Sequence, residues 1–263
     1  MLLSAEHLSI NFGSRQLLDD VNFYLNEGDK VGVIGINGTG KSTFLKVLSG
    51  VTEPDGGTIS RNPNVQVSLL PQNPAMEESA TVLEQVFLHF PAEFRELNEY
   101  EAKAMLNRLG ITDFAQKVGT LSGGQRKRVA LAAALIHPAD VLILDEPTAG
   151  LDPVGVESIL GNIRDYHQSN NATIILVSHS MEEVARTVDR LVVVNDGRVP
   201  FHGAPSEVFQ HGPELEAMGL GVPQMTRVFS RLRAMGVDID ASVYTIPQAK
   251  ETILRRLREK GVE

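Results

Sequence analysis

The chain of 263 residues is long enough for one large domain or two moderate ones with a well-developed core. Apolar residues make up 42% and charged residues 22%, as in a soluble globular protein, and the net charge of -9 argues against a general binder of nucleic acid. There is no cysteine, which excludes disulfides and cysteine-ligated metals. The first residues lack a basic segment followed by an apolar run, so we expect no signal peptide, and no apolar run nears the ~20 residues of a membrane-spanning helix.

The first 30 residues alternate between apolar and polar positions and are broken by turn signals at 11–13 and 27–29. Another tight-turn signal follows at 55–57. Together these patterns predict a small antiparallel β layer.

Further along, short apolar runs alternate with helical patterns, which indicates a parallel sheet covered on both faces. The predicted strands are 30–34, 65–70, 141–144, 173–178 and 191–194. Polar residues follow several of them, and ligands bind at the carboxyl ends of strands in open α/β sheets.

Two segments stand apart from this core, which we place at residues 1–72 and 120–200. Residues 73–119 have helical spacing with dense charges and predict an inserted helical subdomain. Residues 201–263 form a C-terminal extension, with amphipathic helical periodicity at 225–235 and 248–260. The expected fold is α/β: a RecA-like P-loop NTPase core with a mixed sheet, an antiparallel β layer, the helical insert and the helical extension.

Residues 35–43 fit the nucleotide-phosphate loop G-x-x-x-x-G-K-[ST] between a strand and a helix. Backbone N–H groups and the helix N-terminus would face phosphate oxygens. Lys41 would pair with the β- and γ-phosphates, and Ser42 would ligate Mg²⁺. The expected ATP-binding residues of this loop are Asn37, Gly38, Thr39, Gly40, Lys41, Ser42 and Thr43.

Asp145 and Glu146 end an apolar strand, where a carboxylate is costly unless it is paired or holds a cation. Asp145 is expected to hold Mg²⁺ through water, and Glu146 to act as general base or polarise the attacking water. The alternative, an acidic helix N-cap, is weakened by the Pro147 and Thr148 that follow. Another acidic pair, Glu182 and Glu183, is expected only to favour the start of a helix.

A second glycine-rich phosphate sequence lies far from the first, although the chain already supplies a complete site. Its backbone N–H groups, serine hydroxyl and helix N-terminus would suit a γ-phosphate, which suggests closure on ATP with another copy. It consists of Leu121, Ser122, Gly123, Gly124 and Gln125. The basic run 126–128 after it is interpreted as a solvated face, with an RNA contact as the alternative.

These motifs, in this order, resemble the ATP-binding-cassette (ABC) ATPases over residues 1 to about 210. The resemblance implies that Gln72 contacts Mg²⁺ and the attacking water and that His179 contacts the γ-phosphate. It also implies that Phe12 stacks on adenine, although a phenylalanine there can equally be a core residue. Residues 121–125 would complete the opposite subunit's site in a head-to-tail dimer. Asp152 would belong to the loop by which each subunit senses the dimer interface.

Within the superfamily the two halves resemble different groups. Residues 6–138 look like the ABC-F proteins, which are soluble translation factors, whereas residues 145–263 look like the ATPase subunits of energy-coupling-factor importers. This contrast predicts a recombinant, which could have been built deliberately, with a join near 138–149. Each ATP site would need residues from both sides of the join, and a small misplacement of catalytic residues lowers the rate of hydrolysis strongly. We therefore expect the chain to bind ATP·Mg²⁺ but to hydrolyse it slowly.

The leading functional expectation is an ATPase that converts ATP-driven dimer closure into motion of membrane transporter subunits. Its partners would be a second copy or a related ABC subunit, and it would be cytoplasmic, at the inner face of the membrane. The alternatives are a soluble ribosome-associated ATPase of the ABC-F type and a designed scaffold with no physiological partner.

Overall fold

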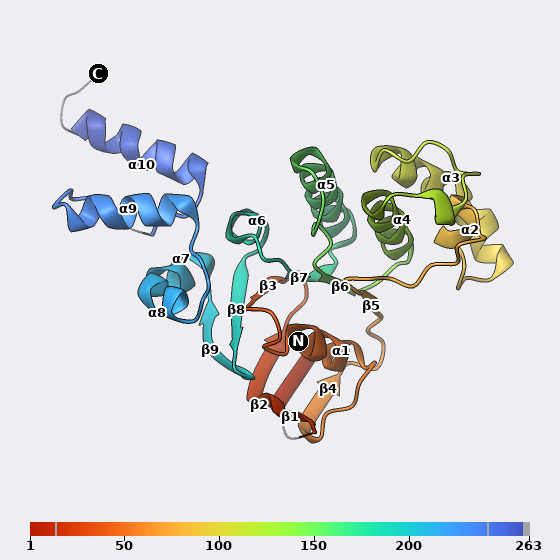
Figure 1. The fold of residues 1–263 in the computed structure, drawn as a ribbon, viewed down its shortest axis with the longest axis horizontal. Coiled ribbons are helices and arrows are strands. Elements are labelled where there is room, and N and C mark those ends of the chain that lie inside the picture. The colour runs from red at the N-terminus through yellow and green to blue at the C-terminus, as the bar shows by residue number, and fades with distance from the viewer. Residues whose placement is uncertain (14, 241, 260–263) are drawn as a thin grey trace.

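Two β-sheets organise the computed structural model, which describes residues 1–13, 15–240 and 242–259 (Figure 1). The smaller sheet is antiparallel, with the strand order β2-β1-β4. Its strands are β1 (Leu3–Phe12), β2 (Arg15–Leu25) and β4 (Gly56–Arg61). The predicted antiparallel layer is confirmed.

The larger sheet has the strand order β5-β6-β7-β3-β8-β9. Neighbours from β5 to β8 pair in parallel, and β9 pairs antiparallel with β8, so the predicted mixed sheet is confirmed. Its strands are β3 (Lys30–Ile34), β5 (Val67–Leu70), β6 (Val141–Asp145), β7 (Thr173–Val177), β8 (Arg190–Asn195) and β9 (Arg198–Gly203). Strands β6 and β7 are buried along their whole length, which explains why they read as unbroken apolar runs.

Helix α1 (Lys41–Ser49) lies between the two sheets (Figure 1). Four of its apolar side chains are fully buried: Phe44, Leu45, Val47 and Leu48. The rings of Phe44 and of Phe23 in β2 pack edge-to-face, with their centroids 5.3 Å apart. Burial on both sides holds the start of α1 at the carboxyl end of β3, where the phosphate loop lies.

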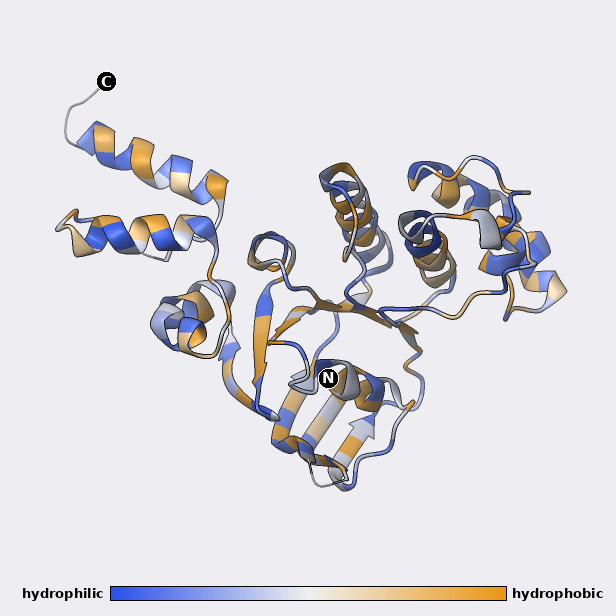
Figure 2. Cartoon of the chain, viewed as in Figure 1, coloured by the Kyte–Doolittle hydropathy of each residue, from blue (hydrophilic) through white to orange (hydrophobic). Residues whose placement is uncertain are grey.

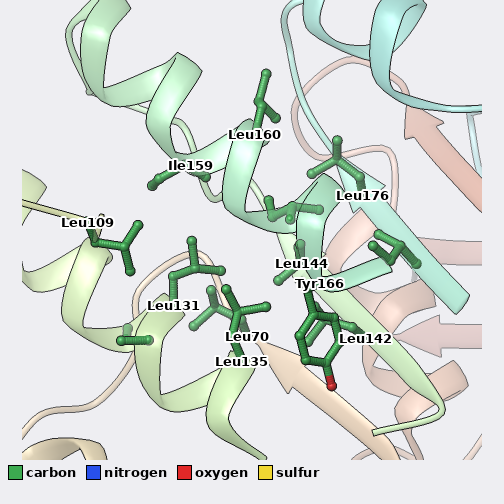
Figure 3. Packing of buried hydrophobic residues seen from close by; sticks show 14 of the residues in the cluster. Leu70, Leu109, Leu131, Leu135, Leu142, Leu144, Ile159, Leu160, Tyr166 and Leu176 are labelled. Carbon is green, nitrogen blue, oxygen red and sulfur yellow. The ribbon is translucent and has the colours of Figure 1, made fainter. Parts of the chain in front are cut away.

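The opposite face of the larger sheet is covered by α4 (Gly123–Ile136), α5 (Pro153–Asn170) and α6 (Met181–Thr187). Leucines and isoleucines from α4 and α5 meet the leucines of the strands in one continuous core (Figure 3). This packing sets the rotation of α4 and α5 about their own axes and therefore decides which of their polar side chains face the sheet's edge.

The predicted insert at 73–119 contains α2 (Val82–Val86), α3 (Ala92–Arg108) and the 3₁₀ turn η1 (Val118–Thr120). Helices α2 and α3 both pack against α4. The start of α4 is thus attached to the insert, while its apolar side faces the main core.

The C-terminal extension begins with α7 (Pro205–Val208), the turn η2 (Phe209–His211) and α8 (Gly212–Ala217). Beyond them, α9 (Gln224–Ala234) and α10 (Ile246–Glu259) confirm the predicted helices, apart from residue 260, which lies outside the described residues. Both alternate between apolar and polar positions (Figure 2). Among the described helices, none has the length and hydropathy needed to cross a membrane.

Candidate functional site

A cavity of about 420 Å³ opens where β3 ends and α1 begins. The structure brings together here the phosphate loop, Gln72 and Glu146, which are far apart in sequence. Its lining residues are Leu17, Asn37, Gly38, Gly40, Lys41, Ser42, Thr43, Gln72 and Glu146. Leu17 was not expected: it comes from β2 of the antiparallel sheet, and nothing in its sequence context marks it.

Glycine is required at both ends of the phosphate loop. Gly40, the residue before α1, has φ 99°, a left-handed conformation that L side chains rarely adopt. At Gly35 a Cβ would lie 2.2 Å from the carbonyl oxygen of Val194 in β8. The loop is therefore pressed against the end of the neighbouring strand and held in one shape.

Lys41 is nearly fully buried, and its ammonium points back into the loop. Its Nζ donates to the carbonyl oxygens of Gly35 at 2.7 Å and Ile36 at 2.8 Å. Burial lowers the pKa of Lys41, and the nearby carboxylates of Glu146 and Asp145 oppose this effect. The cation is thus held at the cavity floor by partners that a phosphate could replace.

Asp145 is buried at the end of β6, and its Oδ1 has no hydrogen-bond partner among the described residues. Burial raises the pKa of Asp145, while a hydrogen bond from Ser42 lowers it. An unpaired buried oxygen beside a hydroxyl fits a hard divalent cation, which prefers oxygen ligands. In the described part of the chain no group of three or more His, Cys, Asp or Glu could hold a metal, so such a cation would need the phosphate oxygens of a nucleotide as well.

Glu146 is the centre of the site and only 7% exposed. The Gln72 amide donates to its Oε2 at 2.7 Å, and His179 Nε2 lies 2.5 Å from its Oε1. These three residues follow β5, β6 and β7, which are neighbours in the sheet. The strand order therefore brings the three predicted residues to one edge of the sheet.

The basic run after the second glycine-rich sequence is a solvated face only in part: Arg126 forms an exposed ion pair, but the interpretation was wrong for Lys127, which turns inward. Arg126 forms a two-pronged ion pair with Glu78, at 2.5 and 2.8 Å. Lys127 Nζ donates to the carbonyl oxygens of Ala149 at 2.6 Å and Glu146 at 3.3 Å. Lys127 lies one helical turn before the buried Leu131, a spacing that could have indicated an inward-facing lysine.

Glu183 was expected only to favour the start of a helix. Its backbone N–H does bond to the Ser180 hydroxyl, at 3.3 Å. Its carboxylate, however, accepts hydrogen bonds from Thr148 at 2.7 Å and Ser178 at 2.9 Å. The side chain thus connects the turn after β6 with the end of β7.

The second glycine-rich sequence, 121–125, lies at the start of α4, and the lining of the cavity described above does not include it. Ser122 caps the helix by accepting from the Gln125 N–H at 3.2 Å, and Gln125 accepts from the Ser122 N–H at 2.9 Å. A Cβ at Gly123 would meet no atom of the described chain within 4 Å. The helix start therefore presents open backbone at Gly123, outside the lining of this subunit's own cavity.

Phe12, Thr39 and Asp152 were also predicted, but the lining of the cavity does not include them. Phe12, at the end of β1, is 79% exposed, so the alternative of a core residue is wrong and its ring is available to a ligand. Asp152 caps α5 by accepting from the Gly155 N–H at 3.0 Å.

A phosphate loop at the end of a central parallel strand, with a carboxylate held opposite it, defines a P-loop nucleotide-binding ATPase. Residues 18–149 match the family described as ABC transporter. The chain belongs to this family, as an ATP-binding cassette of the energy-coupling-factor type.

Relatives extend this likeness over nearly the whole chain. The energy-coupling factor transporter ATP-binding protein EcfA2 of Caldanaerobacter subterraneus subsp. tengcongensis is 39% identical, over 92% of this chain and 91% of its own. EcfA2 of Clostridium tetani is 36% identical, over 94% and 92%. A solved ATP-binding subunit of an ABC transporter has a TM-score of 0.71 at 26% identity, covering 80% of this chain and 93% of that one.

The predicted recombinant of two ABC lineages is not supported. One group of relatives aligns across both proposed halves and the join between them. The resemblance of the first half to ABC-F proteins rested on residues in and around the phosphate loop and the signature. Phosphate binding constrains those segments in every cassette, so they distinguish lineages poorly. Without a seam, the expectation of slow hydrolysis loses its basis.

Proposed function

We propose that this chain binds ATP·Mg²⁺ in the cavity at the phosphate loop and hydrolyses it with Glu146 as the general base. It would do so as the motor subunit of an energy-coupling-factor importer. The observation that carries the proposal is the Glu146 carboxylate, held between Gln72 at 2.7 Å and His179 at 2.5 Å beside the phosphate loop. A carboxylate fixed in this way can take a proton from a water that attacks a bound γ-phosphate.

Each residue around the cavity has a distinct task in this proposal. The loop N–H groups and Lys41 would bind the phosphates, with Lys41 exchanging its carbonyl partners for phosphate oxygens. Ser42, Asp145 and Gln72 would hold Mg²⁺, which supplies positive charge against the phosphate oxygens. The exposed ring of Phe12 would stack on adenine.

The signature 121–125 would complete the site of a second ABC subunit. The side chains of Ser122 and Gln125 are occupied in capping α4. What the signature offers a γ-phosphate is therefore the open backbone at Gly123 and the positive end of the helix. Relatives named EcfA1 as well as EcfA2 match this chain, which supports a related subunit, besides a second copy, as the partner.

When two ABC subunits close on ATP, the energy of that closure would pass to membrane subunits, which choose the solute. The chain would then lie at the cytoplasmic face of the membrane, bound through those subunits, with Asp152 sensing the interface between cassettes.

Glu146→Gln tests the proposal, because the amide keeps the shape of the carboxylate and loses its basicity. With ATP·Mg²⁺ the variant should form stable dimers, alone or with the related subunit, and release phosphate only at a small residual rate. Light scattering and a phosphate-release assay measure the two effects. Wild-type turnover by the variant, or monomers under all conditions, would contradict the proposal.

A further inference from the structure

The turn that carries Glu146 has an unfavourable backbone conformation. Glu146 has φ 51°, in the left-handed region that a residue with a Cβ rarely adopts. Such conformations persist only where the surrounding structure enforces them. The turn that follows, up to Ala149, must therefore be held by its neighbours, and two side chains from different helices make the contacts.

Lys127 holds the turn from the side of α4. Its Nζ bonds the carbonyl oxygens of the first and last residues of the turn, Glu146 at 3.3 Å and Ala149 at 2.6 Å. A charged donor between two carbonyls makes stronger hydrogen bonds than a neutral one. Lys127 lies two residues beyond the signature, on the same helix.

Glu183 holds the turn from the side of α6. Its Oε2 accepts from the hydroxyl of Thr148, in the middle of the turn, and from that of Ser178. Thr148 and Ser178 are 6% and 4% exposed, so these bonds are shielded from water. Ser178 directly precedes His179, which contacts Glu146. One carboxylate oxygen thus ties the turn of Glu146 to the residue before its histidine partner.

We propose that Lys127 and Glu183 are positioning residues for Glu146: together they clamp the turn 146–149 and keep the carboxylate between Gln72 and His179. This inference rests on the proposed role of Glu146 as general base. Because the two clamps belong to the signature helix and to the helix after His179, a shift of either helix would displace the base.

Lys127→Met and Glu183→Met test the clamp, since methionine keeps most of the side-chain length and removes the polar contacts. Displacing the base by about 1 Å should lower kcat by roughly 10- to 100-fold. The KM for ATP should stay within about twofold, because neither side chain lines the phosphate loop. Lys127→Arg, which still donates to both carbonyls, should restore most of the rate.

Two neighbouring pairs provide matched controls. Lys117 also donates to a carbonyl, that of Ser79 at 2.7 Å in the helical insert, and Glu182 accepts from the Gln224 N–H at 3.0 Å. Lys117→Met and Glu182→Met should leave kcat within about twofold of wild type. If a methionine variant of Lys127 or Glu183 does not fold, the alanine variant at the same position, which also removes the polar contacts, must show the same loss of kcat at unchanged KM.

Combining these changes with Glu146→Gln separates the inference from the proposed function. If the clamp acts through the base, Lys127→Met should cause no further loss of residual hydrolysis in the Glu146→Gln background. Normal turnover by Glu146→Gln alone would reject the proposed function. An inactive Glu146→Gln together with an unchanged kcat in Lys127→Met and Glu183→Met would overturn the clamp, as would equal losses in the controls or a fully additive double variant.

Discussion

Gly35→Ala should weaken ATP binding strongly, through one close contact. The new Cβ would lie 2.2 Å from the Val194 carbonyl oxygen and 3.0 Å from the Thr39 hydroxyl, whereas ordinary contacts begin at 3.4 Å. The carbonyl belongs to β8, which is paired on both sides in the sheet and cannot turn aside, so the phosphate loop must move by roughly 1 Å. Displacement of this size in a site built from backbone N–H groups should cost about 100-fold in affinity, or about 2.7 kcal/mol.

Titration with a fluorescent ATP analogue measures this loss, and thermal unfolding shows whether the variant is folded. Gly161→Ala is the matched control, because a Cβ at this position in α5 would meet no described atom within 4 Å. It should raise stability by about 0.5–1 kcal/mol, as replacing glycine within a helix does, and leave ATP affinity unchanged. A folded Gly35→Ala protein that binds ATP within threefold of wild type would refute the close-contact reasoning.

Three further changes separate stability from function. Because burial raises the pKa of Asp145, its ionisation opposes folding as pH rises through that pKa. Asp145→Asn should therefore raise Tm by a few degrees at neutral pH, less as the pH falls, and abolish Mg²⁺-stimulated turnover; a lower Tm would contradict this. Phe12→Ala should weaken ATP binding by about 2- to 10-fold with unchanged Tm, since its ring is 79% exposed, and Phe12→Tyr should restore binding. Tyr166→Phe removes a hydroxyl that donates to His137 O and accepts from Ala139 N–H, both at 3.1 Å, and should cost about 1–3 kcal/mol in urea unfolding with kcat unchanged.

Much of the candidate site could be predicted because its signals are local. The phosphate loop needs glycine at fixed positions between a strand and a helix, and the structure has that loop between β3 and α1. Gln72, Glu146 and His179 each follow an apolar strand, and the carboxyl ends of parallel strands meet at one edge. Their convergence therefore required only the correct assignment of strands.

The contacts that hold the turn of Glu146 were harder to predict from the sequence. Lys127 and Glu183 were assigned to solvent and to a helix start, yet both reach the turn 146–149. The direction in which a helix's polar residues point depends on how its apolar residues pack. Here it depends on the core beneath α4, seen in Figure 3, and on the buried residues of α6. Leu17 reaches the cavity only because a separate sheet packs over α1.

By itself the sequence determined the class of fold, the phosphate loop and the three strand-end residues, since each depends on neighbours a few positions away in the chain. The tertiary structure decided that Glu146 has a left-handed backbone, that Lys127 and Glu183 hold its turn, and that the signature lies outside the lining of this subunit's own cavity. These features depend on contacts between elements that are distant in the chain. The geometry of such contacts is set by how the side chains of those elements pack, which no local sequence pattern specifies.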